Sequence, residues 1–160
     1  MTTKKTEVEA KPINSSKGLM IHAQYIKDLS FENPTAPYSL TNSGQASLDI
    51  NINITTNNIK LNEQNNQTKE VVLHITAKSH IDDNILFIIE LQYAGLFSFD
   101  PEASEGEIET MSYVHCPHVL FPFARRIISD ISTDSGFNPL ILNLIDFNGL
   151  YLEQKNKSDN

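Results

Sequence analysis

The sequence contains no tryptophan and only one cysteine, Cys116, in 160 residues. A single cysteine cannot form an intramolecular disulfide, which is typical of a protein from a reducing compartment. No apolar run approaches the roughly 20 residues of a membrane-spanning helix, and residues 1–17 carry no apolar signal segment. These absences predict a cytoplasmic protein that does not insert into a membrane.

Positive charge is also scarce, with 12 Lys and Arg against 20 Asp and Glu, for a net charge of -8. An acidic chain repels phosphate backbones and anionic lipid surfaces, so nucleic acid and membranes are poor partner candidates. The hydrophobic content of 39 % is enough to fill one core, and the length suits a single domain. We expect protein partners, preferably with basic segments.

Catalytic motifs are missing too, since there is no G-x-S-x-G, Gly-rich phosphate loop, H-E-x-x-H or C-x-x-C. His115, Cys116 and His118 form the only metal-like cluster, and no second cluster completes a zinc site. Cys116 has no recognisable base beside it, and the acids at 102–109 lack the spacing of a calcium loop. We therefore expect a binding protein with no catalytic residue, metal or cofactor, and not an enzyme.

Four segments alternate apolar and polar residues with the period of two that is typical of half-buried strands, namely 19–32, 48–54, 71–78 and 85–99. In the first, Leu19, Ile21, Ala23, Tyr25, Leu29 and Phe31 are expected on the buried face. Ile26 and Lys27 interrupt the pattern and indicate a bulge. Residues 33–45, with two prolines, predict a crossing loop, residues 55–67 predict another loop, and residues 82–84 predict a tight turn.

The period becomes helical over residues 112–134, after an acidic connector at 101–109. Pro117 and Pro122 predict a kink near the start of this helix. An extended linker over 137–145 leads to Asp146, which is expected to cap a last helix. The fold class is therefore α+β, a four-stranded antiparallel sheet followed by two helices packed on one face. The predicted domain spans 19–153, with flexible tails at 1–18 and 154–160.

The first strand carries Asp28 and Glu32 on its solvent side. Glu90, with Ile88 beside it, lies on one face of the fourth strand. If these two strands are neighbours in the sheet, three carboxylates and one aliphatic side chain share a patch. Such a patch is suited to a basic partner.

Five segments, in this order and spacing, resemble the bacterial protein-export chaperones of the SecB family: IKDLSFENP at 26–34, LQYAGLF at 91–97, CPHVLFPFAR at 116–125, FNPL at 137–140 and DFNGLY at 146–151. The resemblance covers roughly residues 20–152. It implies an ATP-independent chaperone that holds unfolded preproteins in apolar grooves and delivers them to the SecA motor. It also implies a cytoplasmic homotetramer, built as a dimer of dimers.

The resemblance further assigns residues to three surfaces. The SecA-binding positions are Asp28, Glu32, Ile88 and Glu90. The client-groove positions are Phe31, Tyr38, Leu40, Phe97, Phe147 and Tyr151. The oligomer-interface positions are Ile89, Leu91, Tyr93, Phe121, Phe123 and Ile127.

One departure concerns Gly44, which stands in the crossing loop where relatives often carry a tryptophan. Three alternatives remain open at this point. The first is a SecB-like or secretion-type chaperone that serves an antitoxin or an effector. The second is a small α+β hydrolase or thioesterase, and the third is an interaction protein without clients.

Overall fold

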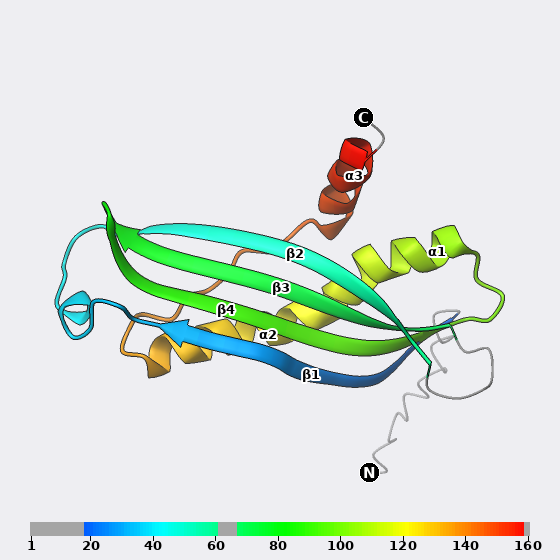
Figure 1. Cartoon of the computed structure of the whole chain (residues 1–160), viewed down its shortest axis with the longest axis horizontal. Helices are drawn as coiled ribbons and strands as arrows, with labels where there is room; N and C mark the ends of the chain where they lie inside the picture. Colours follow the sequence, from blue (N-terminus) through cyan, green and yellow to red (C-terminus); the bar gives the residue numbers. More distant parts are fainter. Residues whose placement is uncertain (1–17, 61–66, 159–160) are drawn as a thin grey trace, which may run out of the picture.

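The computed structural model describes residues 18–60 and 67–158. Its centre is one antiparallel sheet of four long strands, β1 (Leu19–Glu32), β2 (Ser47–Ile59), β3 (Thr68–Ile81) and β4 (Asn84–Phe99). The order across the sheet is β1-β4-β3-β2, so the first and last strands in sequence lie side by side (Figure 1). The predicted four-stranded antiparallel sheet is confirmed, and β2 and β1 form its edges.

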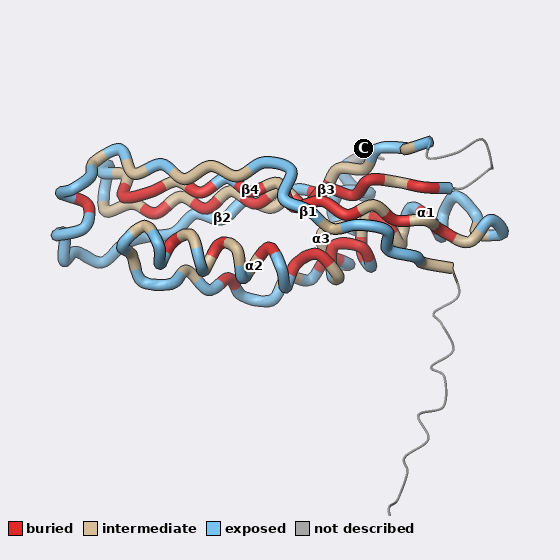
Figure 2. The backbone as a smooth tube through the Cα atoms, turned by 90° about the horizontal axis from the view of Figure 1, so that it is seen from below, coloured by how far each residue is buried: buried red, intermediate tan, exposed pale blue. Residues whose placement is uncertain are grey.

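One face of the sheet is covered by the long helix α2 (Cys116–Asp134), as Figure 2 shows. Leu120, Ala124 and Ile128, spaced by four residues, are fully buried and form the side of α2 that faces the sheet. The missing side chain at Gly95 of β4 leaves room for Leu120, because a Cβ there would lie 2.9 Å from Leu120 Cδ2. The core is therefore a two-layer sandwich of sheet and helix, and we call the helix side of the sheet the covered face and the other side the open face.

The strand β1 departs from its predicted alternation because it contains two bulges. Its pairing with β4 shifts between Ile21 and Ala23 and again between Ile26 and Asp28. The second bulge was predicted, but the first was not. The first bulge turns Ala23 and Tyr25 toward the open face, where both are exposed, so their predicted burial is wrong.

The crossing loop contains a short 3-10 helix, η1 (Tyr38–Leu40), and the Asp82 turn joins β3 to β4. The second strand runs on to Ile59, so the loop predicted from residue 55 begins later than expected. Thr55 and Thr56, which follow the apolar row, still pair with Val72 and Val71 of β3. Residues 61–66 of that predicted loop lie outside the described part of the chain.

The helical region begins earlier than predicted. A first helix, α1 (Glu105–Thr110), occupies part of the expected connector, and Ser104 and Glu107 form a capping box at its start. A π-helical turn, η2 (Met111–His115), then leads directly into α2. The helical irregularity is this π-helical turn, which lies before Cys116, whereas Pro122 lies inside the regular part of α2. Two of the acidic residues after Pro101, Glu105 and Glu107, therefore lie in the first turn of a helix.

The last helix, α3 (Phe147–Ser158), follows the extended linker as predicted. The Asp146 carboxylate accepts a hydrogen bond from the Gly149 N–H at 3.0 Å, which confirms the predicted cap. The helix packs against the π-helical turn, where Tyr151 stacks on Tyr113 with ring centroids 5.9 Å apart. It continues to Ser158, so the tail predicted from residue 154 is helical over most of its length. The predicted N-terminal tail lies almost entirely outside the described residues.

Candidate functional site

The open face carries the predicted acidic patch, formed by Asp28, Glu32, Glu90 and Ile88. The register of β1 with β4 places Ser30 opposite Glu90 and Glu32 opposite Ile88. Asp28 lies opposite Gln92, the next residue after Glu90 on the same face of β4. Residues directly opposite in an antiparallel pair point to the same face. The structure therefore brings together all four residues that sequence reasoning placed in this patch, and their role in SecA binding stays a prediction.

The three carboxylates of the acidic patch are exposed to solvent. Within residues 18–60 and 67–158, the ion pairs of the structure join Lys27 to Glu70, His80 to Asp49 and Arg126 to Asp130, and none involves the patch. Their negative charge is thus left to solvent and to any incoming partner. Like charges held on one rigid face attract a basic segment and orient it.

Beside the patch lies a polar group that sequence reasoning missed, which we call the Glu70 cluster: Tyr25, Lys27, Asn57 and Glu70. Glu70 is only 7 % exposed. Its carboxylate accepts hydrogen bonds from the Tyr25 hydroxyl at 2.5 Å, the Lys27 ammonium at 2.8 and 3.0 Å and the Asn57 amide at 3.1 Å. The cluster joins β1, β2 and β3 across β4.

The electrostatics of the Glu70 cluster follow from these bonds. Burial raises the pKa of Glu70, but hydrogen bonds from Lys27, Tyr25 and Asn57 outweigh it and lower that pKa to about 2. Burial and the adjoining carboxylate raise the pKa of Tyr25 to about 12. Burial, with the nearby Lys27 charge, also lowers the pKa of His74. Glu70 is therefore ionised at neutral pH.

A second candidate surface, which we call the client groove, runs along the free edge of β2. Leu48, Ile50 and Ile52 project in succession toward the covered face, and the extended linker passes alongside them. One hollow of about 460 Å³ lies between Leu48, the crossing loop and residues 136–140. Another of about 450 Å³ lies between Ile50, Ile52 and residues 144–153. The two hollows follow each other along one strand and are suited to an extended chain.

The predicted groove residues divide into three groups by exposure. Tyr38 and Leu40 are exposed on the crossing loop, while Phe31 and Tyr151 are partly buried. Phe97 and Phe147 are 0 % and 1 % exposed, so they support the core and offer no surface to a client. Sequence reasoning missed Leu48, Ile50, Ile141 and Leu144, whose side chains are 40 % to 86 % exposed. The signal was present, since these are apolar residues on an edge strand and in a linker.

The predicted oligomer positions also divide. Ile89, Leu91, Tyr93 and Phe121 are buried within the single chain. Phe123 is 44 % exposed on α2 and stacks on Tyr93 at 6.2 Å, and Ile127 is half-buried. Two exposed residues of the β1 edge strand, Ile21 and Ile26, were not predicted. The apolar surface available to a second copy therefore lies along β1 and the adjacent side of α2.

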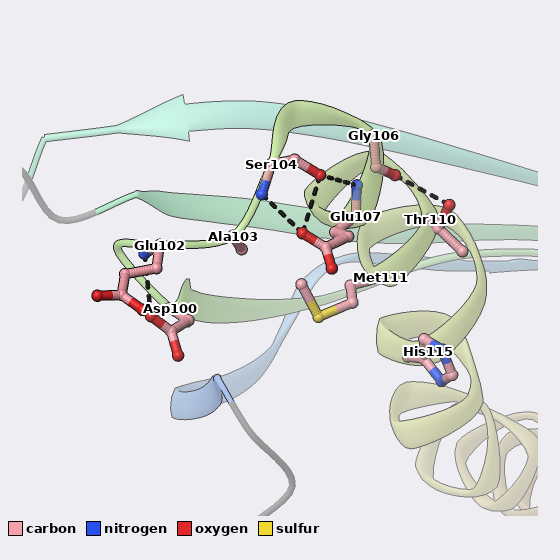
Figure 3. A pocket seen from close by; sticks show the side chains of 9 residues that line it. All are labelled: Asp100, Glu102, Ala103, Ser104, Gly106, Glu107, Thr110, Met111 and His115. Atoms are coloured by element: carbon pink, nitrogen blue, oxygen red, sulfur yellow. Dashed lines mark hydrogen bonds between the residues drawn. The ribbon is translucent and has the colours of Figure 1, made fainter.

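Neither a cysteine nucleophile nor a metal site gains support from the residues that would form it. Burial raises the pKa of the Cys116 thiol to about 12, which makes a thiolate nucleophile rare at neutral pH. No group of three or more His, Cys, Asp or Glu placed to hold a metal ion occurs in the described part of the chain. An acidic hollow of about 690 Å³ near α1 is lined by Asp100, Glu102 and Glu107 (Figure 3). Glu107 there caps the helix through Ser104, and these bonds lower its pKa.

An antiparallel sheet with an acidic open face and an apolar groove along one edge is typical of a binding protein that holds extended polypeptides. The family model described as "Preprotein translocase subunit SecB" matches residues 13–158. The chain therefore belongs to the SecB family of protein-export chaperones. The predicted export-chaperone function is confirmed at this level.

Individual relatives agree. A protein-export protein SecB of Rickettsia akari is 44% identical over 145 residues, which cover 89% of this chain and 91% of the relative. One from Maricaulis maris is 42% identical over 137 residues, covering 85% and 76% of the two chains. In fold, the chain is similar to a SecB-like chaperone of Mycobacterium tuberculosis, solved in complex with an antitoxin peptide. That likeness has a TM-score of 0.65 at 13% identity, and covers 80% of this chain and 91% of the other.

The antitoxin alternative is not favoured, because relatives more than 40% identical are named as export proteins, whereas the antitoxin-bound chaperone shares the fold alone. Among the described helices, none is both long and apolar enough to span a membrane.

Proposed function

We propose that the chain holds unfolded preproteins in the client groove without ATP and passes them to the SecA motor through the acidic patch. The observation that carries this proposal is the separation of the two surfaces. The groove lies at the β2 edge on the covered face, whereas the patch lies on β1 and β4 on the open face. A client and a motor protein can therefore be bound at the same time.

The client groove supplies weak contacts that add along an extended chain. Apolar burial contributes about 25 cal/mol per Å², and the exposed side chains of Tyr38, Leu48 and Leu144 are spread over the crossing loop, β2 and the linker. Each contact is small, but successive contacts on one client strengthen one another through effective concentration. Folded proteins hide their apolar side chains, so the groove selects unfolded chains without reading a sequence.

We further propose that the protein works in the cytoplasm as a homotetramer, a dimer of dimers. The support is the edge strand β1 with its exposed Ile21 and Ile26. Ile26 lies opposite Tyr93, on which Phe123 of α2 stacks. A free edge strand with apolar flanks is a ready site for pairing with another copy. Native mass measurement tests this, and a stable monomer at micromolar concentration would contradict it.

The test of the two-surface proposal compares wild type with Glu90→Gln in two assays. SecA binding should weaken, since the change removes one exposed carboxylate of the patch. The delay that the protein imposes on refolding of a slow-folding preprotein, without nucleotide, should be unchanged. Equal loss in both assays would show that the surfaces are not separate.

A further inference from the structure

Glu70 is a buried carboxylate that neither the core nor the acidic patch explains. It lies on β3 opposite Leu96 of β4 and Asn57 of β2, on the open face. An ionised group with this little exposure persists only when its partners replace the lost water. Here three side chains do so, and one of them, Lys27, is the cation that directly precedes Asp28.

The position of Lys27 in β1 is unusual. It is the extra residue of the second bulge, between Ile26 opposite Tyr93 and Asp28 opposite Gln92. The bulge lets its side chain cross β4 and place the ammonium 2.8 Å from Glu70 Oε2. The same bulge returns Asp28, Ser30 and Glu32 to the open face beside Glu90. One irregularity therefore both presents the patch and directs the neighbouring lysine away from it.

We propose that Glu70 is a positioning residue that holds the Lys27 ammonium away from Asp28, and so keeps the acidic patch available to a basic partner. This inference rests on the proposed docking role of the patch. Without the Glu70 charge, the flexible lysine stem is free to approach the adjacent Asp28 carboxylate, its nearest alternative in sequence. An intramolecular cation there competes with the basic partner for the same charge.

A second reading of the same contacts is that the cluster only staples the strands together. The two readings differ in binding, because a staple affects stability and leaves the Lys27 charge irrelevant to affinity. They also differ from a simple effect of net charge. Removing one negative charge from the open face weakens attraction for a basic peptide by the same factor, whatever residue occupies position 27.

A double-mutant cycle with Glu70→Gln and Lys27→Gln separates these readings. The probe is a dye-labelled oligolysine peptide, titrated against each variant from low salt to about 0.5 M salt, where surface charges are screened. We expect Glu70→Gln to weaken binding about threefold to fivefold at low salt. In the Lys27→Gln background the same change should have little effect, and the differences should vanish at high salt.

An equal loss in both backgrounds, or no loss in either, would overturn the inference. Glu90→Gln is measured in parallel, because unchanged binding in that variant means that the docking role itself is wrong. Weaker binding in Glu90→Gln with no coupling between Glu70 and Lys27 means that only the positioning role is wrong. Circular dichroism and native mass establish that each variant is folded and assembled. If Glu70→Gln does not fold, the same cycle is run with Glu70→Asp. The shorter aspartate side chain keeps the negative charge but moves the carboxylate farther from the Lys27 ammonium.

Discussion

The covered and open faces of the sheet are made by the same four strands, yet they are filled in opposite ways. On the covered face, β3 and β4 present Leu73, Ile75, Ile89 and Leu91, all almost completely buried under α2. On the open face, the same strands present Glu70, His74 and Glu90. Alternation of side chains gives each strand both faces at once. The covered face therefore supplies the apolar core under α2, while the open face carries the charged and polar side chains of the acidic patch and the Glu70 cluster.

The strands of the sheet also tolerate irregularity differently. The pairing of β2 with β3 has no register shift, and that of β3 with β4 has one, between Ser79 and His80 near the turn that joins them. A one-residue shift in the middle of these strands would turn their apolar rows outward. The edge strand β1 contains two bulges and lies beside only one other strand. There, a shift costs little core packing and redirects exposed side chains such as Tyr25 and Lys27. Functional placement on this fold is thus concentrated where the packing constraint is weakest.

The largest expected effect comes from breaking the covered face. Leu120→Ala removes a fully buried side chain from the first half of α2, opposite Gly95. We expect a loss of about 3 to 4 kcal/mol in the free energy of unfolding, from lost burial and the cavity left behind. Denaturant unfolding at one fixed protein concentration measures it, since assembly adds to apparent stability. The matched control is Leu144→Ala, where the side chain is 86 % exposed, and a loss of similar size there would contradict the assignment of the core.

The next effect is the pH dependence that the open face adds. The pKa of Glu70 is lowered to about 2 in the folded chain, so the unfolded chain binds its proton first as pH falls. The contribution of the ionised Glu70 carboxylate to the free energy of unfolding is fully present above about pH 4.5 and is lost between about pH 4.5 and pH 2. The free energy of unfolding should therefore fall by roughly 3 kcal/mol across this range, since each pKa unit corresponds to about 1.4 kcal/mol.

Glu70→Gln isolates that contribution. The stability difference between wild type and this variant should shrink as pH falls through that window, as measured by urea unfolding at several pH values. The lowered pKa of His74 also costs stability as pH falls below about 6.5 in both proteins. A difference independent of pH would mean that Glu70 is not ionised in the folded state.

The same division explains what could be read from the sequence. The four strands and the long helix were predictable because packing under α2 imposes strict apolar periods on them. The acidic patch was predictable because Asp28, Glu32 and Glu90 follow the same period on the opposite face. The bulge at His22 could not be predicted. One extra residue in β1 reverses which side chains face the core, but the residue types in the segment remain typical of a regular strand.

The Glu70 cluster and the client groove required the fold. Lys27, Asn57 and Glu70 come from three strands, and only the order β1-β4-β3-β2 brings them together. The resemblance placed Phe97 and Phe147 in the groove because their positions match groove positions of the family, but both lie in the core. Exposure depends on which neighbours arrive from elsewhere in the chain, and local sequence carries little of that information.

A smaller effect is expected at the start of α3, outside both faces. Asp146→Ala removes the acceptor of the Gly149 N–H, and loss of such a cap costs about 1 kcal/mol. Hydrogen exchange of the first turn of α3 should become faster, while exchange in β3 and β4 stays unchanged. Asp146→Asn is the matched control, because its amide oxygen still accepts this bond. Equal exchange in the Ala and Asn variants would mean that the cap does not hold the helix.

The smallest effect on stability, but a clear one on function, is expected in the client groove. Leu144→Asp places a charge where an apolar client segment would lie, beside Ile50 and Ile52. The side chain is almost fully exposed, so the free energy of unfolding should change by less than about 0.5 kcal/mol. The delay in preprotein refolding should nevertheless weaken severalfold, because burying a client against a carboxylate is unfavourable.

Asn143→Asp is the control, since it adds the same charge at the neighbouring exposed position, which is not among the residues that line this hollow. If the two variants weaken client holding equally, charge repulsion accounts for the effect and the groove lies elsewhere; if only Leu144→Asp does, the β2 edge and the linker hold the client while the acidic patch remains free for the motor.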